Sequence, residues 1–361
     1  MTPRRLRSFS ASLFALAAIL PAAPAPASST MPVPFLNWEK LPALPDPEGF
    51  AAMFAGVSGE MLLLAGGAHF PDKRPWEGGT KIWDDAVWAL ASPHGEWRKI
   101  GALPRRTAYG ISVTTPSGVL CAGGSDAQVH LAATFLLIWD GRKLHTKQLP
   151  DLPKTAANLS GAIAGNTFYA LGGTERPDST EPLNTFWGLD TTNPASGWRA
   201  LPPCPGPARL LAVVGAVGDT FYVFSGVGLH AGPDGKPVRT YLKDAYAFSP
   251  ARTWRRLADL PCSVAAAASP APMTADGQLL VLSGDDGTLV HLNGPRHPGF
   301  PQSVLAYRPA EDCWVKVGTA PFSRATVPTT VWRGKWIIPN GERIPGYRSP
   351  EVWSLDFMPP R

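Results

Sequence analysis

Two ionisable residues near the end of the chain could carry out acid and base chemistry. The segment from Asn340 to Arg348 reads N-G-E-R-I-P-G-Y-R, with a Pro-Gly turn between Glu342 and Arg348. Such a turn predicts that the carboxylate and the guanidinium face each other. A carboxylate beside a guanidinium supplies a proton-transferring group and an anchor for an anion. A structural salt bridge across the turn is the alternative interpretation.

The elements that must position this segment belong to a sixfold repeat. An apolar strand ends each time in a Gly-Gly doublet or a degenerate copy of it. The first members of these doublets are 57, 49, 53, 58 and 57 residues apart, at Gly66, Gly123, Gly172, Ser225, Ser283 and Asn340. Repeats of about 50 residues are typical of kelch propellers. We therefore predict an all-β fold, a six-bladed kelch β-propeller whose repeated tryptophans wedge between blades rather than bind sugars.

The two ends of the mature chain are predicted to meet in one blade. The last copy of the repeat stops at its third strand, Val352–Asp356. The segment Phe35–Pro42 has the pattern of the missing fourth strand. The last blade is therefore expected to be closed by the N-terminal strand, which removes a free sheet edge.

The N-terminus has the features of an export signal. Basic residues (Arg4, Arg5 and Arg7) precede an apolar run over residues 11–20, and small residues lead to a cleavage site near Ala27. We expect a signal peptide at 1–27, a propeller domain at 28–361 and a periplasmic location. No other stretch is apolar for long enough to cross a bilayer, so stable membrane insertion after cleavage is not expected.

Charge and cysteine content narrow the function further. The formal net charge is +5, but three of the positive residues lie in the signal, which leaves the mature chain near +2. Bulk charge therefore gives no support for nucleic-acid binding. Four cysteines lie far apart and form no C-x-x-C motif, and we expect mostly unpaired, buried thiols.

Strand alternation predicts which loops share a face. The loop after each doublet and the loop between successive blades should open on the same side of the propeller, near its axis. Guanidinium groups in these loops suit a carboxylate-bearing small molecule, although loops are in general polar and solvated. The candidate substrate-binding residues are Arg105, Arg106, Arg209, Arg324, Glu175 and Arg176.

The final loop resembles the N-G-E-x-x-P-G-x-R motif of the sialic acid mutarotases, or N-acetylneuraminate epimerases. Over residues 35–357 the chain resembles the cyclically permuted branch of that family, in which the motif lies in the last blade. The resemblance implies that Glu342 and Arg348 are the catalytic pair, that the partner is an anionic sugar, and that no cofactor or metal is needed. Family members often have Lys where Ile344 stands and Thr where Ser349 stands.

The implied reaction interconverts the anomers of N-acetylneuraminate by opening and reclosing the ring. It takes a proton from the anomeric hydroxyl and gives one to the ring oxygen, and then reverses these transfers on the other face of the anomeric carbon. A single carboxyl whose pKa is raised towards neutral could serve both steps.

Three other functions fit parts of the sequence. Propellers often serve as non-catalytic modules that bind a glycan or a protein. A sialidase would need an Asp-box in several blades, whereas one loose copy is present at Ser283–Thr288 and lacks the closing Trp. A copper oxidase would need converging Tyr and His ligands, and the seven histidines show no such pattern.

Overall fold

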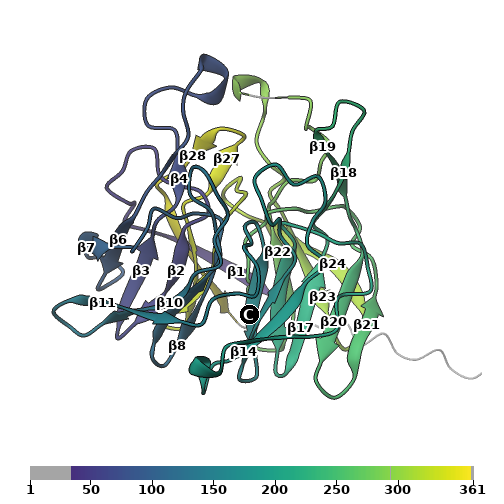
Figure 1. Cartoon of the computed structure of the whole chain (residues 1–361), viewed down its shortest axis with the longest axis horizontal. Coiled ribbons are helices and arrows are strands. Elements are labelled where there is room, and N and C mark those ends of the chain that lie inside the picture. The colour runs from purple at the N-terminus through teal and green to yellow at the C-terminus, as the bar shows by residue number, and fades with distance from the viewer. Residues whose placement is uncertain (1–33, 293, 359–361) are drawn as a thin grey trace, which may run out of the picture. The chain divides into compact units, whose positions relative to one another are not determined.

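The computed structural model describes residues 34–292 and 294–358, and the predicted signal and its cleavage site lie outside them. Within this part the chain forms six antiparallel sheets arranged as the blades of a propeller (Figure 1). The predicted six-bladed all-β fold is confirmed. No helix among the described residues is long and apolar enough to cross a membrane.

Five of the sheets have four strands and one has three. From the axis outward the strands are β2 (Phe54–Ser58), β3 (Met61–Ala65), β6 (Ala86–Leu90) and β7 (Arg98–Ala102) in blade 1; β8 (Ile111–Thr115), β9 (Gly118–Ala122), β10 (Thr134–Trp139) and β11 (Leu144–Leu149) in blade 2; β12 (Ser160–Ala164), β13 (Thr167–Leu171), β14 (Phe186–Asp190) and β15 (Trp198–Ala200) in blade 3; β16 (Val213–Val217), β17 (Thr220–Phe224), β20 (Ala245–Ser249) and β21 (Thr253–Leu257) in blade 4; β22 (Leu279–Leu282), β23 (Ser303–Arg308) and β24 (Cys313–Thr319) in blade 5; and β25 (Thr330–Trp332), β26 (Lys335–Pro339), β29 (Val352–Met358) and β1 (Phe35–Leu41) in blade 6.

Three small hairpins rise from the loops that follow the doublets. They are β4 (Ala68–His69) with β5 (Ile82–Trp83), β18 (Val227–Ala231) with β19 (Pro237–Tyr241), and β27 (Glu342–Ile344) with β28 (Tyr347–Arg348). Short 3-10 helices lie at Pro75–Glu77, Pro194–Ser196 and Gly294–Arg296.

The closure of the last blade by the N-terminal strand is confirmed. Strand β1 pairs antiparallel with β29, with Trp38 opposite Leu355 and Leu41 opposite Val352. The outermost strand of blade 6 thus comes from the beginning of the chain and the third strand from its end. Strand β29 therefore has a neighbouring strand on each side, and β1 forms the outer edge of the blade.

Blade 5 departs from the predicted repeat because its innermost segment is not a regular strand. Pro270 and Pro272 fall where the other blades have β2, β8 or β16. Proline has no N–H to donate to a ladder. The segment still packs in place, since Ala271 N donates to Val214 O at 2.7 Å and Leu280 N donates to Pro272 O at 2.8 Å.

Backbone conformation explains which residue types occupy the two positions of each doublet. The first member has φ between 54° and 65° in all six copies and the second has φ between 88° and 107°. Serine or asparagine tolerates the first value, which explains Ser225, Ser283 and Asn340. The second position is glycine every time because a side chain there would be strained and would also strike the neighbouring inner segment, as at Gly341 against Val327.

The tryptophans of the outermost strands bridge neighbouring blades, as predicted. Trp97 Nε1 donates to Pro42 O at 2.7 Å, Trp254 Nε1 donates to Pro202 O at 2.7 Å, and Trp314 Nε1 donates to Ala258 O at 3.0 Å. Each indole is therefore committed to a backbone carbonyl of the preceding blade. These residues hold the blades together and are not platforms for a ligand.

Six residues form a closed ring of backbone hydrogen bonds around the axis. Each has a positive φ of 53–64° and donates its N–H to the carbonyl of its counterpart in the preceding blade at 2.5–3.1 Å. The members are Ala52, Tyr109, Asn158, Leu211, Ala266 and Thr326. Because every blade contributes one donor and one acceptor, the ring fixes the spacing of the blades. It does so on the face that carries the loops after the doublets and the loops between blades.

Candidate active site

Glu342 and Arg348 face each other across the β27–β28 hairpin. They are register partners in the ladder, and Gly346 occupies the turn with φ of 87°. The prediction that the Pro-Gly turn brings the two side chains together is confirmed. The backbone of Glu342 also pairs with Ala325, which precedes the ring residue Thr326. Its N–H donates to Ala325 O and its carbonyl accepts from Ala325 N, both at 2.8 Å.

The two side chains form an ion pair that uses one carboxylate oxygen. Arg348 and the backbone N–H of Gly346 both donate to Oε1 of Glu342, the latter at 2.9 Å. No contact of Oε2 is found within the described part of the chain. Arg348 also donates from Nε to Ala68 O at 3.2 Å and lies over the Phe70 ring. The arginine side chain is 3% exposed and the glutamate side chain 21% exposed, so the carboxylate is the accessible partner.

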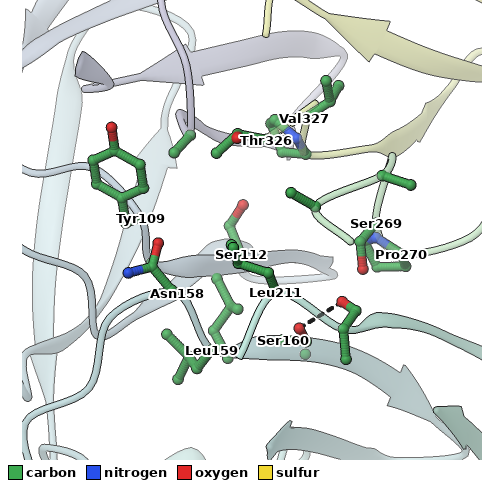
Figure 2. A pocket seen from close by; sticks show the side chains of 18 of the residues that line it. Tyr109, Ser112, Asn158, Leu159, Ser160, Leu211, Ser269, Pro270, Thr326 and Val327 are labelled. Atoms are coloured by element: carbon green, nitrogen blue, oxygen red, sulfur yellow. Dashed lines mark hydrogen bonds between the residues drawn. The ribbon is translucent and has the colours of Figure 1, made fainter. Parts of the chain in front are cut away.

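These two residues line a cavity of about 530 Å³ above the ring. Its volume is within the range of small-molecule sites. The polar wall also contains Lys81, His130, Arg239 and Asp285, from four different blades. Loops after the doublets and loops between blades both contribute, which confirms that the two loop sets share a face. A second, smaller cavity of about 80 Å³ is lined by the six ring residues and by residues of the inner segments such as Ser112, Ser160 and Pro270 (Figure 2).

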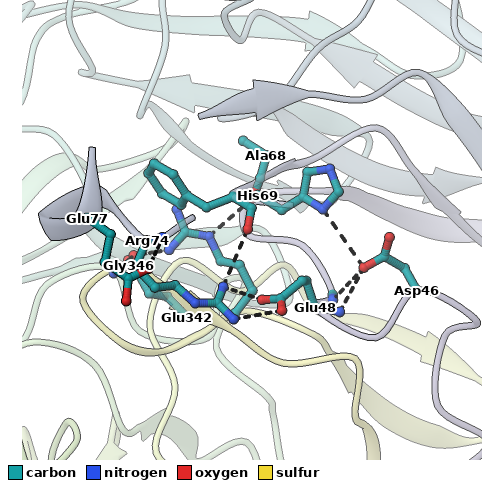
Figure 3. Close-up of polar contacts among 11 residues, drawn as sticks. Asp46, Glu48, Ala68, His69, Arg74, Glu77, Glu342 and Gly346 are labelled. Carbon is teal, nitrogen blue, oxygen red and sulfur yellow. Dashed lines mark hydrogen bonds and ion pairs between the residues drawn. The ribbon is translucent and has the colours of Figure 1, made fainter. Parts of the chain in front are cut away.

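A layer of charged residues in blade 1 supports the hairpin from outside the cavity (Figure 3). Arg74 pairs with both carboxylate oxygens of Glu48 and stacks on the Tyr347 ring at 4.3 Å. His69 follows Ala68 on β4, and its imidazole lies 3.8 Å from Asp46. Burial lowers the pKa of His69, which keeps the ring neutral near neutral pH.

The residue after each doublet occupies an equivalent position in every blade, where it bridges to the inner segment. Blade 6 has Glu342 there, blade 5 has Asp285 and blade 2 has Ser125, and all three line the cavity. Asp285 accepts from Gly287 N at 3.0 Å and from the Tyr241 hydroxyl at 2.5 Å. Burial, followed by the Asp285 hydrogen bond, raises the pKa of Tyr241 to about 12, so the phenol remains the donor.

The six residues predicted to bind substrate lie outside the lining of this cavity, and each has a charged partner. Arg105 pairs with Asp126, Arg106 with Asp85, Arg209 with Asp244, Arg324 with Glu351, Glu175 with Lys154 and Arg176 with Asp178. The first of these pairs reaches the cavity only through Asp126. The structure therefore brings together Glu342 and Arg348 but not this set, whose contact with substrate stays a prediction.

Arg324 shows how a loop arginine of this set is held by protein groups. Its side chain is 5% exposed and donates to Glu351 at 2.7 Å and to the Ser349 hydroxyl at 2.6 Å. It borders a separate groove of about 740 Å³. Ser349, one of the two departures from the family motif, is thus engaged by a buried arginine rather than facing the central cavity.

Several cavity residues were not among the candidate binding residues predicted from the sequence. The position of Asp285 after the doublet of blade 5, equivalent to that of Glu342 in blade 6, does place it on this face. Lys81 and Trp83 come from the β4–β5 excursion of blade 1, and Arg239 comes from β19 in blade 4. These excursions are specific to single blades, so the repeat carries no information about them.

Fold and site together define a class: a six-bladed β-propeller with a carboxylate–guanidinium pair exposed to a cavity at the mouth of its central channel. Comparison with known proteins then adds a sequence resemblance. A sequence model described as N-acetylneuraminate epimerase matches residues 25–146. This segment includes β1, blade 1 and blade 2 up to the middle of β11, so it does not include the β27–β28 hairpin.

Curated relatives carry the same description. An N-acetylneuraminate epimerase of Brucella suis is 36% identical over 124 residues, which cover 30% of this chain and 31% of the relative. One of Yersinia enterocolitica is 30% identical over 251 residues, covering 62% of this chain and 61% of the relative. The matches thus span between about a third and three fifths of these relatives. The resemblance to N-acetylneuraminate epimerases predicted from the final loop is confirmed.

A solved structure shares the fold over most of its length. The structure of YjhT superposes with a TM-score of 0.64 at 15% sequence identity, covering 88% of this chain and 99% of YjhT. At this identity the likeness concerns the fold alone.

Proposed function

We propose that this chain is a mutarotase that interconverts the anomers of N-acetylneuraminate. The observation that carries the proposal is the placement of Glu342, which lines the cavity with a partly exposed side chain and is held by Arg348 through Oε1. The described relatives named N-acetylneuraminate epimerase support the choice of sugar. The activity belongs to the isomerases.

Glu342 is the proton-transferring group in this mechanism. Arg348 and the Gly346 N–H both donate to Oε1, which leaves Oε2 to act as the base in this scheme. It takes the proton of the anomeric hydroxyl as the bond between the anomeric carbon and the ring oxygen breaks. The electron pair of that bond goes to the ring oxygen, which then receives the proton from Glu342.

The open-chain ketone rotates about the bond between its carbonyl carbon and the next carbon of the chain, which presents the other face of the carbonyl. The same steps then run in reverse. Glu342 accepts the proton of the attacking hydroxyl and returns it to the carbonyl oxygen on the other face. Protons and charges balance without any further reactant. No metal or cofactor takes part in this proposal.

Arg348 acts through Glu342 in this scheme. Its guanidinium is almost fully buried and already donates to Glu342 and to Ala68 O. It therefore has little capacity left for a substrate carboxylate, and its fixed charge stabilises negative charge beside the anomeric centre.

The test is anomer exchange followed by NMR after crystalline β-N-acetylneuraminate is dissolved with and without the protein. Wild type should accelerate the appearance of the α-anomer. Glu342→Gln should lower that acceleration by roughly 10²–10⁴-fold, the usual contribution of general acid–base catalysis. The matched control is Glu39→Gln, which removes a half-exposed carboxylate of the same blade that pairs with Lys335 and should exchange like wild type.

Two results would contradict the proposal. Exchange at the wild-type rate in Glu342→Gln would remove Glu342 from the mechanism. Binding of the sugar by wild type without any acceleration would instead favour a non-catalytic glycan-binding propeller.

We also propose that residues 1–27 direct the chain to the periplasm, on the basis of their basic start, apolar run and small residues near Ala27. Mass spectrometry of the protein from a periplasmic extract should find a chain that begins at Ser28. A cytoplasmic chain that retains Met1 or Thr2 would contradict this location.

A further inference from the structure

Lys81 is a cation in the cavity wall that has no carboxylate partner among residues 34–292 and 294–358. Its ammonium lies 4.8 Å from the centroid of the Trp83 ring and 5.0 Å from that of Tyr109. It also lies 3.4 Å from the Tyr109 hydroxyl. Two aromatic rings attract and hold an ammonium without neutralising it. The charge of Lys81 therefore remains available to an anion that enters the cavity.

The other cations of the cavity are engaged by protein groups. Arg348 donates to Glu342 and to Ala68 O. Arg239 interacts with the Tyr241 hydroxyl, which in turn donates to Asp285. Lys81 thus differs from Arg348 in having no carboxylate neighbour among the described residues, and from Arg239 in lying against two aromatic rings.

Lys81 is joined to the acid–base pair by a short chain of contacts. It immediately precedes β5, whose Trp83 is the ladder partner of Ala68 on β4. The carbonyl of Ala68 accepts the Nε–H of Arg348, which holds Glu342. The cation and the carboxylate therefore stand on neighbouring elements of blades 1 and 6 that are bonded to each other.

This arrangement matches the substrate class. In a 2-keto sugar acid the carboxylate is attached to the anomeric carbon itself. An anchor for it must lie beside the group that transfers the anomeric proton, not across the face of the protein. The arginines predicted from the sequence lie outside the lining of this cavity and pair with carboxylates of the protein.

We propose that Lys81 binds the carboxylate of the substrate and so selects sugar acids over neutral sugars. This inference rests on the proposed function for the identity of the sugar. Trp83 and Tyr109 position the ammonium, and Tyr109 is itself fixed by the hydrogen-bonded ring at the base of the cavity.

The test measures binding separately from catalysis. The probes are the methyl glycoside of N-acetylneuraminate, which cannot open its ring, and the methyl ester of that glycoside, which lacks the negative charge. Calorimetric dissociation constants are compared for wild type, Lys81→Gln and Lys81→Arg. The matched control is Lys99→Gln, which removes an exposed lysine from the outer strand β7 of the same blade.

Wild type and Lys99→Gln should bind the acid more tightly than the ester. Lys81→Gln should lose about ten- to hundredfold of affinity for the acid, the effect of one charge-assisted hydrogen bond. Its affinity for the ester should stay unchanged. Lys81→Arg should recover part of the preference, because it restores the charge with a different shape.

Unchanged preference for the acid in Lys81→Gln would overturn the inference, as would equal losses for acid and ester. So would a wild type that does not distinguish the two probes. Failure of the proposed function would look different: the acid preference would depend on Lys81, but the free sugar would show no faster anomer exchange.

Discussion

Two buried arginine–carboxylate pairs in this propeller have the same chemistry and different surroundings. In blade 4, Arg209 grips both oxygens of Asp244 at 2.7 and 2.8 Å, and its side chain is 1% exposed. It donates to Ser225 O as well. In blade 6, Arg348 holds one oxygen of Glu342, whose side chain is 21% exposed at the cavity. All three guanidinium nitrogens of Arg209 donate to oxygen atoms of the protein. The pair in blade 6 uses only Oε1 of Glu342, which leaves the other carboxylate oxygen for a substrate.

The difference shows what turns an ion pair into a reactive group. Both pairs place a guanidinium beside a carboxylate, so residue type does not separate them. The number of carboxylate oxygens used and the access of the carboxylate to a cavity do separate them. We therefore expect changes in the Arg209 pair to affect stability and changes in the Arg348 pair to affect exchange.

The largest expected effect comes from removing the carboxylate charge of each pair. Asp244→Asn leaves the Arg209 guanidinium buried without its counter-ion and should lower the free energy of unfolding by about 3–5 kcal/mol. Glu342→Gln should lower it by only about 1 kcal/mol, because its site opens to water. Denaturant unfolding and exchange rates per folded molecule should be measured on both. A lower rate of anomer exchange in Asp244→Asn at unchanged stability would contradict the structural role of the Arg209–Asp244 pair.

A smaller effect should follow from replacing each arginine by lysine, which keeps the charge and loses the planar fork. Arg209→Lys cannot serve both oxygens of Asp244 and Ser225 O, and we expect a loss of about 1–3 kcal/mol in stability. Arg348→Lys cannot reach both Glu342 and Ala68 O, and exchange should fall about tenfold, equivalent to one weakened hydrogen bond.

The readout that sharpens this second comparison is the Michaelis constant. Arg209→Lys should leave it unchanged for the sugar acid. A raised Michaelis constant at normal stability would support the substrate contact that the sequence predicted for Arg209, and would contradict the structural role.

The smallest expected effect is on the pH dependence of stability, because Arg348 has a titratable neighbour. Burial lowers the pKa of His69, and Arg348 lowers it further, while Asp46, Asp84 and Glu48 act in the opposite direction. The unfolded chain therefore binds a proton at a higher pH than the folded one does. The contribution of neutral His69 to stability should be fully present above about pH 6.5, the ordinary pKa of histidine. It should be lost as the pH falls from there through the lowered pKa of the folded state.

The check is the midpoint of thermal unfolding at a series of pH values for wild type and His69→Phe. Phenylalanine preserves the ring contact with Phe50 and removes the titrating group. The variant should lose less of its stability on acidification than wild type does. Identical slopes would show that His69 does not contribute to the dependence.

Local signals in the chain were enough to predict most of the fold. The doublets mark backbone that only glycine adopts at the second position, so they counted the six blades even where Ser225, Ser283 or Asn340 replaced the first glycine. The Pro-Gly turn predicted the Glu342–Arg348 contact because residues six apart meet across a hairpin without help from other blades. The repeat did not reveal that blade 5 lacks a regular inner strand, because only the prolines at 270 and 272 indicate this departure.

The binding residues could not be predicted in the same way. Arg209 and Arg324 lie in loops with the right composition, but each is taken up by a carboxylate 35 or 27 residues away that becomes its neighbour only on folding. Lys81 had no pattern around it, and its aromatic neighbour Tyr109 comes from the next blade.

The sequence by itself determined the number of blades, the closure of the last blade by β1 and the hairpin that carries the acid–base pair. These features depend on backbone conformation and on contacts within one repeat. Only the tertiary structure decided which charges are neutralised and which face the cavity. That outcome depends on contacts made only on folding, because a guanidinium such as that of Arg209 pairs with a carboxylate far from it in the sequence.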